Sequence, residues 1–259
     1  MPETILLLGQ DEVTPVDAQG AVALMAARDP GLPFTYIVPI NAQVMVLGSR
    51  AETGLAPAMA AAWMRLNDSQ VLSRLHRWAT GVSVPVAPGS DVAQMLLRQV
   101  IQPEDPITII GGGPLLVPAL RETYGLRRVA QHEPPMGYIR SPEAREAAIR
   151  FAEAHPARFV FVATGAPRSE ILMAEMQARA SVTGLGIAVG SGLLFSVGLT
   201  RRAPDWMRRA GIEWLHRAWT EPMRLGRRYA EDLPPLLRMT LRARRLARAR
   251  RASGPAGGR

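Results

Sequence analysis

Short apolar runs alternate with longer amphipathic stretches along the first 200 residues of the chain. The apolar runs are rich in β-branched and aromatic residues, and they predict strands at 34–38, 107–110, 159–163 and 185–189. The stretches that follow or separate them predict helices at 41–50, 114–124, 142–154 and 169–180. This alternation is typical of an α/β domain whose mainly parallel sheet is flanked by helices.

Glycines follow the predicted strands, at the place where a Rossmann-like sheet of this class binds ligands. A glycine turn before a helix lets a phosphate or a ribose approach the backbone closely, although such a turn is often only a turn. No GxGxxG fingerprint is present, which disfavours a nicotinamide or flavin dehydrogenase. The candidate ligand-binding residues at these turns are Gly111, Gly112, Gly165, Ala166, Pro167, Ser169, Glu170 and Gly190.

Ser169 and Glu170 have an alternative interpretation. Both residue types are favoured in the first turn of a helix, so these two could simply open the helix that follows Gly165.

The sequence changes character near residue 201. Residues 1–200 hold 15 Arg against 17 acidic residues, whereas residues 201–259 hold 16 Arg against 5. We therefore expect an α/β catalytic domain over 1–200 and an Arg-rich helical appendage over 201–259, with a disordered end from about Ser253.

Within the appendage, residues 236–251 predict a basic amphipathic helix. One helical face collects its apolar residues, which are Leu236, Met239, Ala243, Leu246 and Ala247. Such a helix typically lies on an anionic membrane surface, although it could also pack that face on the domain and expose its charges to solvent. Nucleic acid would attract the same charge, but no recognisable nucleic-acid module is present, and we expect no nucleic-acid partner.

The composition limits which cofactors and ligands the chain can bind. The chain has no cysteine and four histidines without metal-ligand spacing, so we expect neither a metal nor another cofactor. All 31 basic residues are Arg, the side chain best shaped to bind phosphate in a bidentate fork. We expect no signal peptide, and the uncharged stretches at 30–49 and 181–200 are too interrupted by Pro, Gly or amides to predict membrane spans.

Two aspartates are considered as catalytic or helix-capping residues. Asp68 follows a stretch that we interpret as apolar and helical, and it is followed by Ser69; such an Asp is more often a helix cap than a catalyst. Asp91, in Pro88-Gly89-Ser90-Asp91, predicts a turn and a helix start.

Several motifs together resemble the WecG/TagA/CpsF glycosyltransferase family. The most specific is the C-terminal signature, and the resemblance runs from about Phe34 to Tyr229. The motifs are Pro88-Gly89-Ser90-Asp91, Gly165-Ala166-Pro167-Arg168-Ser169-Glu170, Arg202-Ala203-Pro204-Asp205-Trp206-Met207, Gly211-Ile212-Glu213-Trp214-Leu215-His216-Arg217, Glu221-Pro222-Met223-Arg224 and Arg227.

The resemblance implies a bacterial enzyme that moves a hexose from a UDP-sugar to an undecaprenyl-diphosphate-linked saccharide, inverting the anomeric centre without a metal. It implies peripheral association with the inner, cytoplasmic face of the plasma membrane, and a role in cell-surface polysaccharide assembly such as capsule or exopolysaccharide. Asp68 would be the base, Asn41 would contact donor or acceptor, and Arg217, Arg224 and Arg227 would clamp the diphosphate.

The chain departs from the family pattern at four positions. Pro39 replaces a Thr, Ser69 replaces a Gly, Val86 replaces an Arg and Ser169 replaces a Gln. These departures bear on the donor sugar more than on the reaction. They also define an alternative function, a catalytically inactive nucleotide-sugar-binding or scaffold homologue of the same fold.

Overall fold

The computed structural model describes residues 3–201, 203–204, 206–207, 211–220, 223 and 226–252. The expected disorder from Ser253 onward falls outside the described residues. So do several residues of the C-terminal signature, among them Arg202, Asp205, Glu221 and Arg224.

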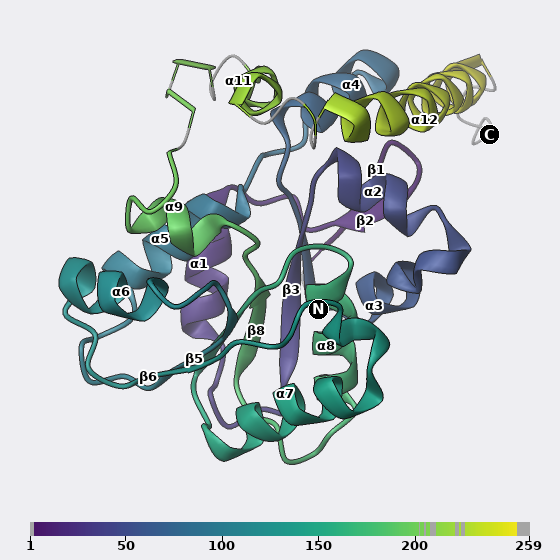
Figure 1. The fold of residues 1–259 in the computed structure, drawn as a ribbon. Coiled ribbons are helices and arrows are strands. Elements are labelled where there is room, and N and C mark those ends of the chain that lie inside the picture. Colours follow the sequence, from purple (N-terminus) through teal and green to yellow (C-terminus); the bar gives the residue numbers. More distant parts are fainter. Residues whose placement is uncertain are drawn as a thin grey trace.

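A six-stranded sheet forms the centre of the molecule (Figure 1), in the order β4-β3-β8-β7-β5-β6. Each neighbouring pair is parallel. The α/β fold predicted from the sequence is therefore confirmed. The strands are β3 (Thr35–Ile40), β4 (Met64–Asn67), β5 (Ile107–Gly111), β6 (Val129–His132), β7 (Phe159–Ala163) and β8 (Leu185–Ala188).

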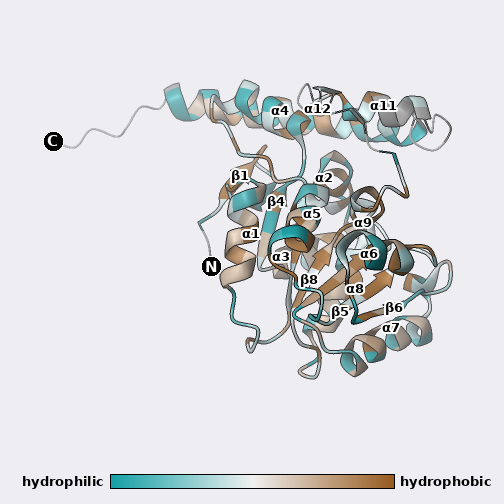
Figure 2. Ribbon diagram, turned by 90° about the vertical axis from the view of Figure 1, so that its left-hand side faces the viewer, coloured by the Kyte–Doolittle hydropathy of each residue, from teal (hydrophilic) through white to brown (hydrophobic). Residues whose placement is uncertain are grey.

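Helices cover both faces of the sheet, and each face has its own hydrophobic cluster. Figure 2 shows hydrophobic strands enclosed by more polar helices. One face is covered by α1 (Ala18–Ala27), α5 (Gly89–Gln99), α6 (Leu116–Tyr124) and α9 (Gly192–Ser196). The other is covered by α2 (Ala42–Gly48), η1 (Ala51–Thr53), α3 (Leu55–Ala61), η2 (Tyr138–Arg140), α7 (Pro142–Ala154) and α8 (Arg168–Gln177).

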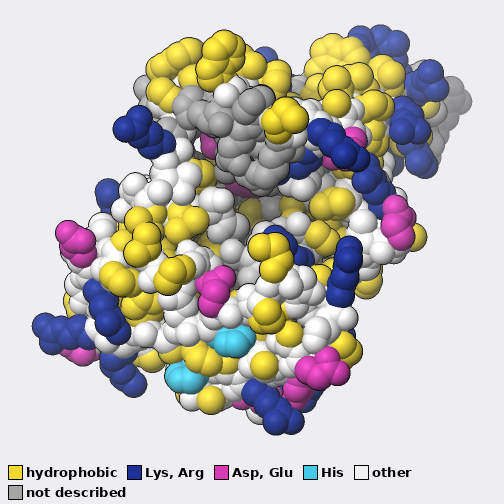
Figure 3. Space-filling model, in the orientation of Figure 1, with side chains coloured by type: hydrophobic (Ala, Val, Ile, Leu, Met, Phe, Trp, Pro, Cys, Tyr) yellow, Lys and Arg dark blue, Asp and Glu magenta, His cyan; other side chains and the backbone are white. Residues whose placement is uncertain are grey.

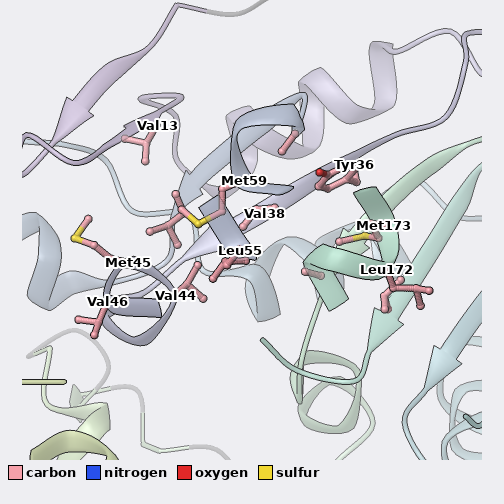
Figure 4. Close-up of a cluster of buried hydrophobic side chains, with 14 of the residues drawn as sticks. Val13, Tyr36, Val38, Val44, Met45, Val46, Leu55, Met59, Leu172 and Met173 are labelled. Atoms are coloured by element: carbon pink, nitrogen blue, oxygen red, sulfur yellow. The ribbon is translucent and has the colours of Figure 1, made fainter. Parts of the chain in front are cut away.

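Side chains of α2, α3, β3 and α8 meet in the second of these clusters (Figure 4). Met45, Leu55 and Met173 are all at most 1% exposed there. Tyr36 is fully buried among them, and its hydroxyl donates to the carbonyl of Ala58. Its polar atom is therefore satisfied inside an apolar environment.

The stretch before Asp68 corrects one prediction. Residues 64–67 form strand β4 and not part of a helix, because Met64 and Leu66 are buried in the sheet while Arg65 reaches outward to Glu12 at 3.0 Å. The edge strand β6 was not predicted either, and its four residues are all only half-buried. A small hairpin of β1 (Ile5–Leu7) and β2 (Asp11–Val13) continues into Thr14, whose N–H donates to the carbonyl of Arg65 at 2.8 Å.

Gly184, which precedes β8, shows why the sequence needs a glycine there. Its φ is +91°, and a Cβ atom would lie 2.0 Å from the carbonyl oxygen of Ala157. Neither the backbone conformation nor the space admits a side chain.

The C-terminal helix α12 (Arg227–Ala252) packs on α4 (Gln70–Thr80) and α2. Leu236, Met239 and Ala243 are 6%, 8% and 5% exposed and join the hydrophobic cluster of α4. The apolar face that we expected on a membrane is thus used largely for packing on the domain. From the same predicted face, Leu246 remains 48% exposed.

Two arginines of α12 hold its second half on α4. The Arg244 guanidinium carbon lies 3.8 Å from the centre of the Trp78 ring, and Arg251 Nη2 donates to the Thr80 carbonyl at 2.6 Å. A cation at the last carbonyls of α4 also interacts favourably with the helix dipole. Part of the positive charge of the appendage therefore serves intramolecular docking.

None of the helices in the described part of the chain is long and apolar enough to cross a membrane.

The packing of α12 on α4 and α2 can be tested at two adjacent leucines, because Leu236 is 6% exposed and Leu237 is 47% exposed. We expect Leu236→Ser to lower the free energy of local opening of α12 by about 2–4 kcal/mol, because it removes a buried apolar side chain. Leu237→Ser should leave that opening nearly unchanged. Hydrogen exchange of the α12 amides measures both, and equal protection in the two variants would contradict the packing described.

Candidate functional site

Asn41 and Asp68 follow the neighbouring strands β3 and β4, so they meet at the carboxyl edge of the sheet. Asn41 Nδ2 donates to Asp68 Oδ2 at 3.3 Å, and the N–H of Gly89 donates to Asp68 Oδ1 at 2.8 Å. Two donors on different elements thus fix the orientation of the carboxylate. Three residues that lie far apart in the sequence come together here.

Helix starts hold both side chains in place. Asn41 is the N-cap of α2, and its Oδ1 accepts from the N–H of Val44 at 3.1 Å, which leaves Nδ2 to face Asp68. Ser69 is the N-cap of α4 and accepts from the N–H of Leu72 at 3.3 Å. Asp68 therefore lies between a strand end and a helix start and is not itself the cap.

Gly89 approaches Asp68 because it has no side chain. A Cβ atom on Gly89 would lie 2.7 Å from Cγ of Pro39, one of the departures from the family pattern. On its other side, a Cβ atom on Gly192 would lie 3.1 Å from Cα of Ser90. These close approaches bring the start of α5 against the end of β3, and the start of α9 against the start of α5. Gly89 and Gly192 were not among the predicted site residues.

The glycine turn after β5 is fixed by two side chains at the end of β6. Gln131 Nε2 donates to the carbonyls of Gly111 at 3.0 Å and of Gly113 at 2.9 Å. The Glu133 carboxylate accepts from the N–H of Gly113 at 2.8 Å. The sequence analysis did not identify Gln131 and Glu133, because it did not predict β6. The available signal was the apolar pair Val129-Ala130 followed by polar residues, a pattern that can mark the end of a strand.

The turn after β7 places its polar residues inward. Ser169 is 1% exposed, and its Oγ lies 3.1 Å from Thr164 Oγ1, which in turn lies 2.9 Å from the Tyr138 hydroxyl. Ala166–Pro167 is a cis peptide bond. Gly165, Ala166 and Pro167 are half-buried, so of this predicted group the turn itself reaches the surface and Ser169 does not.

Glu170 is buried as well, at 3% exposure. Its Oε2 atom has no hydrogen-bond partner among the described residues. Burial raises the pKa of Glu170 to about 7, against opposing effects of its own backbone N–H and of Arg168. This carboxyl therefore takes up a proton near neutral pH.

Gly190 follows β8 between these two groups of loops. It is half-buried, with a φ of +49°, and a Cβ atom there would meet no atom of the described residues within 4 Å. The space beside it is open at the centre of the carboxyl edge, where a ligand could approach the backbone.

The predicted arginine clamp is described only in part. Arg217 belongs to α11 (Glu213–Thr220), but its side chain lies outside the described atoms, as does all of Arg224. Arg227 begins α12, where its 85% exposed side chain pairs with Glu231 at 2.8 Å. Figure 3 shows the surface hollowed between these C-terminal helices and the α/β domain.

No group of three or more His, Cys, Asp or Glu side chains suited to a metal ion occurs within the described ranges. His76 is buried on α4, where its Nδ1 accepts from the N–H of Leu8 at 3.0 Å, and burial lowers its pKa. The His76 ring therefore links α4 to the turn between β1 and β2.

We compared the sequence with models of known protein families. The model of the Glycosyl transferase WecG/TagA/CpsF family matches residues 5–250, nearly the whole chain. The match includes the sheet, the Asn41–Asp68 pair and almost all of α12.

Glu170→Gln tests the buried carboxyl. An unfolded carboxyl titrates near about 4.3, and Glu170 titrates at about 7 in the fold, so the folded state holds the extra proton between these values. The free energy of unfolding should therefore fall as the pH rises from about 5 to about 8, and Glu170→Gln should raise it at pH 8 by an amount on the order of 2 kcal/mol. Urea unfolding at both pH values measures this.

The matched control is Glu122→Gln, which removes an exposed carboxyl from α6 and should show no such gain. A Glu170→Gln variant that is less stable than the wild type at pH 8 would contradict the interpretation.

Proposed function

We propose that this chain, which belongs to the WecG/TagA/CpsF family of glycosyltransferases, transfers a hexose from a UDP-sugar to a polyprenyl-diphosphate-linked saccharide. The family supports a nucleotide-sugar donor and a lipid-linked acceptor in general. The hexosyl and UDP specificity, the inversion of the anomeric centre and the site residues below are parts of the proposal. So is a role in capsule or exopolysaccharide synthesis.

The observation that carries the proposal is the position of Asp68. It lies at the carboxyl edge of a parallel sheet, where ligands of α/β proteins bind, and it is half-buried. Hydrogen bonds from Gly89 and Asn41 hold its carboxylate in one orientation. A carboxylate fixed in this way suits a general base, which must meet the acceptor hydroxyl in a defined geometry.

In the proposed reaction, the acceptor oxygen attacks the anomeric carbon of the donor sugar from the face opposite UDP. The new C–O bond forms as the bond to the diphosphate oxygen breaks, and UDP leaves with that electron pair. The proton of the acceptor hydroxyl passes to Asp68. A single displacement of this kind inverts the anomeric centre.

Negative charge accumulates on the leaving diphosphate. The proposal assigns its stabilisation to Arg217, Arg224 and Arg227, with no metal or other cofactor required. Among the described residues, the ion-pair partner of Arg227 is Glu231, and this pair is exposed. Exposed pairs contribute at most about 1 kcal/mol, so exchanging this carboxylate for a diphosphate costs little.

The loops around Asp68 supply the proposed sugar and nucleotide contacts. Asn41 lies against Asp68 itself, and Gly190 and Gly165 follow the central strands β8 and β7. Gly111 and Gly112 lie further along the same edge. Ser169 and Glu170, which are buried, would act by supporting the turn after β7.

The outer face of α12 supports association with the inner face of the plasma membrane. Leu233, Leu237 and Leu241 recur every four residues along it and are 54%, 47% and 48% exposed. Exposed arginines flank this row, and α11 adds Trp219 at 86% exposure. Hydrophobic side chains gather over the C-terminal helices in Figure 3. Apolar residues flanked by Arg are typical of a helix that lies in a membrane interface.

The alternative, an inactive nucleotide-sugar-binding or scaffold homologue, is favoured by Ser169. This residue replaces the family's Gln and is turned into the interior, where it contacts Thr164 and not the surface.

Asp68→Asn separates the two functions. We expect sugar transfer to fall at least roughly a hundredfold, because an amide cannot accept the proton, while UDP binding persists. Transfer assays measure the first effect, and calorimetric titration with UDP in the presence of EDTA measures the second. Transfer at the wild-type rate in Asp68→Asn would exclude this residue as the base, and failure of the wild type to bind UDP would favour the scaffold.

Asp29→Asn is the matched control. The Asp29 carboxylate also accepts a glycine N–H at 2.8 Å, from Gly31, but it lies before β3, at the opposite edge of the sheet. Its transfer rate should equal that of the wild type.

Leu241→Ser tests the membrane-facing row. We expect binding to anionic vesicles to weaken roughly tenfold, the loss expected when one leucine no longer enters the interface. Leu32→Ser, at the same 48% exposure but before β3, should leave binding unchanged. Equal co-sedimentation of the two variants with vesicles would show that the outer face of α12 does not contact lipid.

A further inference from the structure

A cavity of about 550 Å³ lies between the first half of α12 and the residues that follow α2. Three arginines line it: Arg50 from the α2 side, and Arg238 and Arg242 from α12. The two helical residues are four apart, so they lie on the same side of α12.

The cavity has an excess of positive charge. Within the described part of the chain, no carboxylate lies within ion-pair distance of Arg50, Arg238 or Arg242. The one acid in its lining is Glu231, whose carboxylate is paired with Arg227. Asp232 is buried beside Arg50, and burial raises its pKa against the opposing effects of the Arg228 and Arg50 charges. The cavity is therefore suited to an anion.

The rest of the lining is mixed, because Gln10 and Ser49 are polar whereas Ala230, Pro234, Pro235 and Met239 are apolar. Pro234, Pro235 and Met239 form part of the wall on the α12 side. A ligand that presents a phosphate to the arginines would bring whatever it carries next against these three side chains. On the α12 side, arginines next to apolar side chains suit an amphiphile, whose phosphate and apolar part would each have a partner.

The cavity lies apart from Asn41 and Asp68, although it adjoins the proposed diphosphate clamp through the Glu231–Arg227 ion pair. Ser49 and Arg50 follow the carboxyl end of α2, whereas Asn41 caps its amino end, and seven helical residues span about 10 Å. It adjoins the outer face of α12, because Arg238 and Arg242 each directly follow a leucine of the exposed row. A lipid in the cavity would thus lie beside the surface proposed to face the membrane.

We propose that this cavity binds the phosphate headgroup of an anionic phospholipid. The guanidinium groups of Arg50, Arg238 and Arg242 contact the phosphate, and Pro235 and Met239 contact the glycerol and the first carbons of the acyl chains. Headgroup binding here fixes the orientation of the protein on the bilayer, which general attraction to a charged surface does not. The inference rests on the proposed membrane association.

The test is a calorimetric titration of the full chain with monomeric dihexanoyl phosphatidylglycerol, which offers the headgroup without a charged surface. We expect saturable binding by the wild type and at least tenfold weaker binding by Arg238→Gln/Arg242→Gln. Arg50→Gln should also weaken binding, and because it leaves α12 unchanged, it separates loss of a contact from unfolding of that helix.

Arg245→Gln/Arg248→Gln is the matched control, since it removes two exposed charges from α12 outside the cavity. Its affinity should stay within twofold of the wild type. Equal losses in the two double variants, or no binding by the wild type, would overturn the proposal. Inorganic phosphate that binds as tightly as the lipid would show a free-anion site instead.

The same variants distinguish this inference from the proposed reaction. Sugar transfer to a short-chain, water-soluble acceptor does not require a bilayer, so it should continue at the wild-type rate in Arg238→Gln/Arg242→Gln. A wild-type protein that transfers sugar but binds no lipid would reject the cavity assignment alone. Saturable lipid binding by a wild-type protein that transfers no sugar would reject the reaction alone.

Discussion

The parallel arrangement of all six strands is the constraint on which the rest of this structure depends. Because every strand runs the same way, every loop that follows a strand emerges at one edge. That edge brings Asn41 and Asp68 into hydrogen-bond contact and sets the glycine turns after β5, β7 and β8 beside them. Nothing in the local sequence around these residues requires them to meet.

Helix α4 connects this edge to the C-terminal appendage. Its N-cap, Ser69, directly follows Asp68, and its C-terminal end contacts Arg244 and Arg251 of α12. Gly211 lies against its first turns, where a Cβ atom would lie 3.2 Å from Gln70 Cβ. The appendage and the proposed base are therefore positioned by the same helix, which explains how a chain segment rich in repelling charges acquires a defined place over the domain.

Much of the site was predictable because its residues carry local signals. Asn41 begins a helix pattern, glycines end the apolar runs, and the C-terminal signature is specific for the family. Ser169 and Glu170 show the limit of such signals. A polar pair after a glycine turn indicates a ligand contact and a helix start equally well, and only the packing of α8 against the sheet shows that both side chains lie inside.

The sequence by itself determined the fold class, the main strands and helices of the domain, and the family, since these depend on periodicity and on motifs that are contiguous in the chain. The tertiary structure decided which face of α12 is buried, because Leu236 and Leu237 are equally apolar and only the surface offered by α4 and α2 distinguishes them. It also decided the partners of Asp68 and the cavity between α2 and α12. Each of these joins residues that are distant in sequence, and such contacts depend on how preformed elements pack, which no local pattern records.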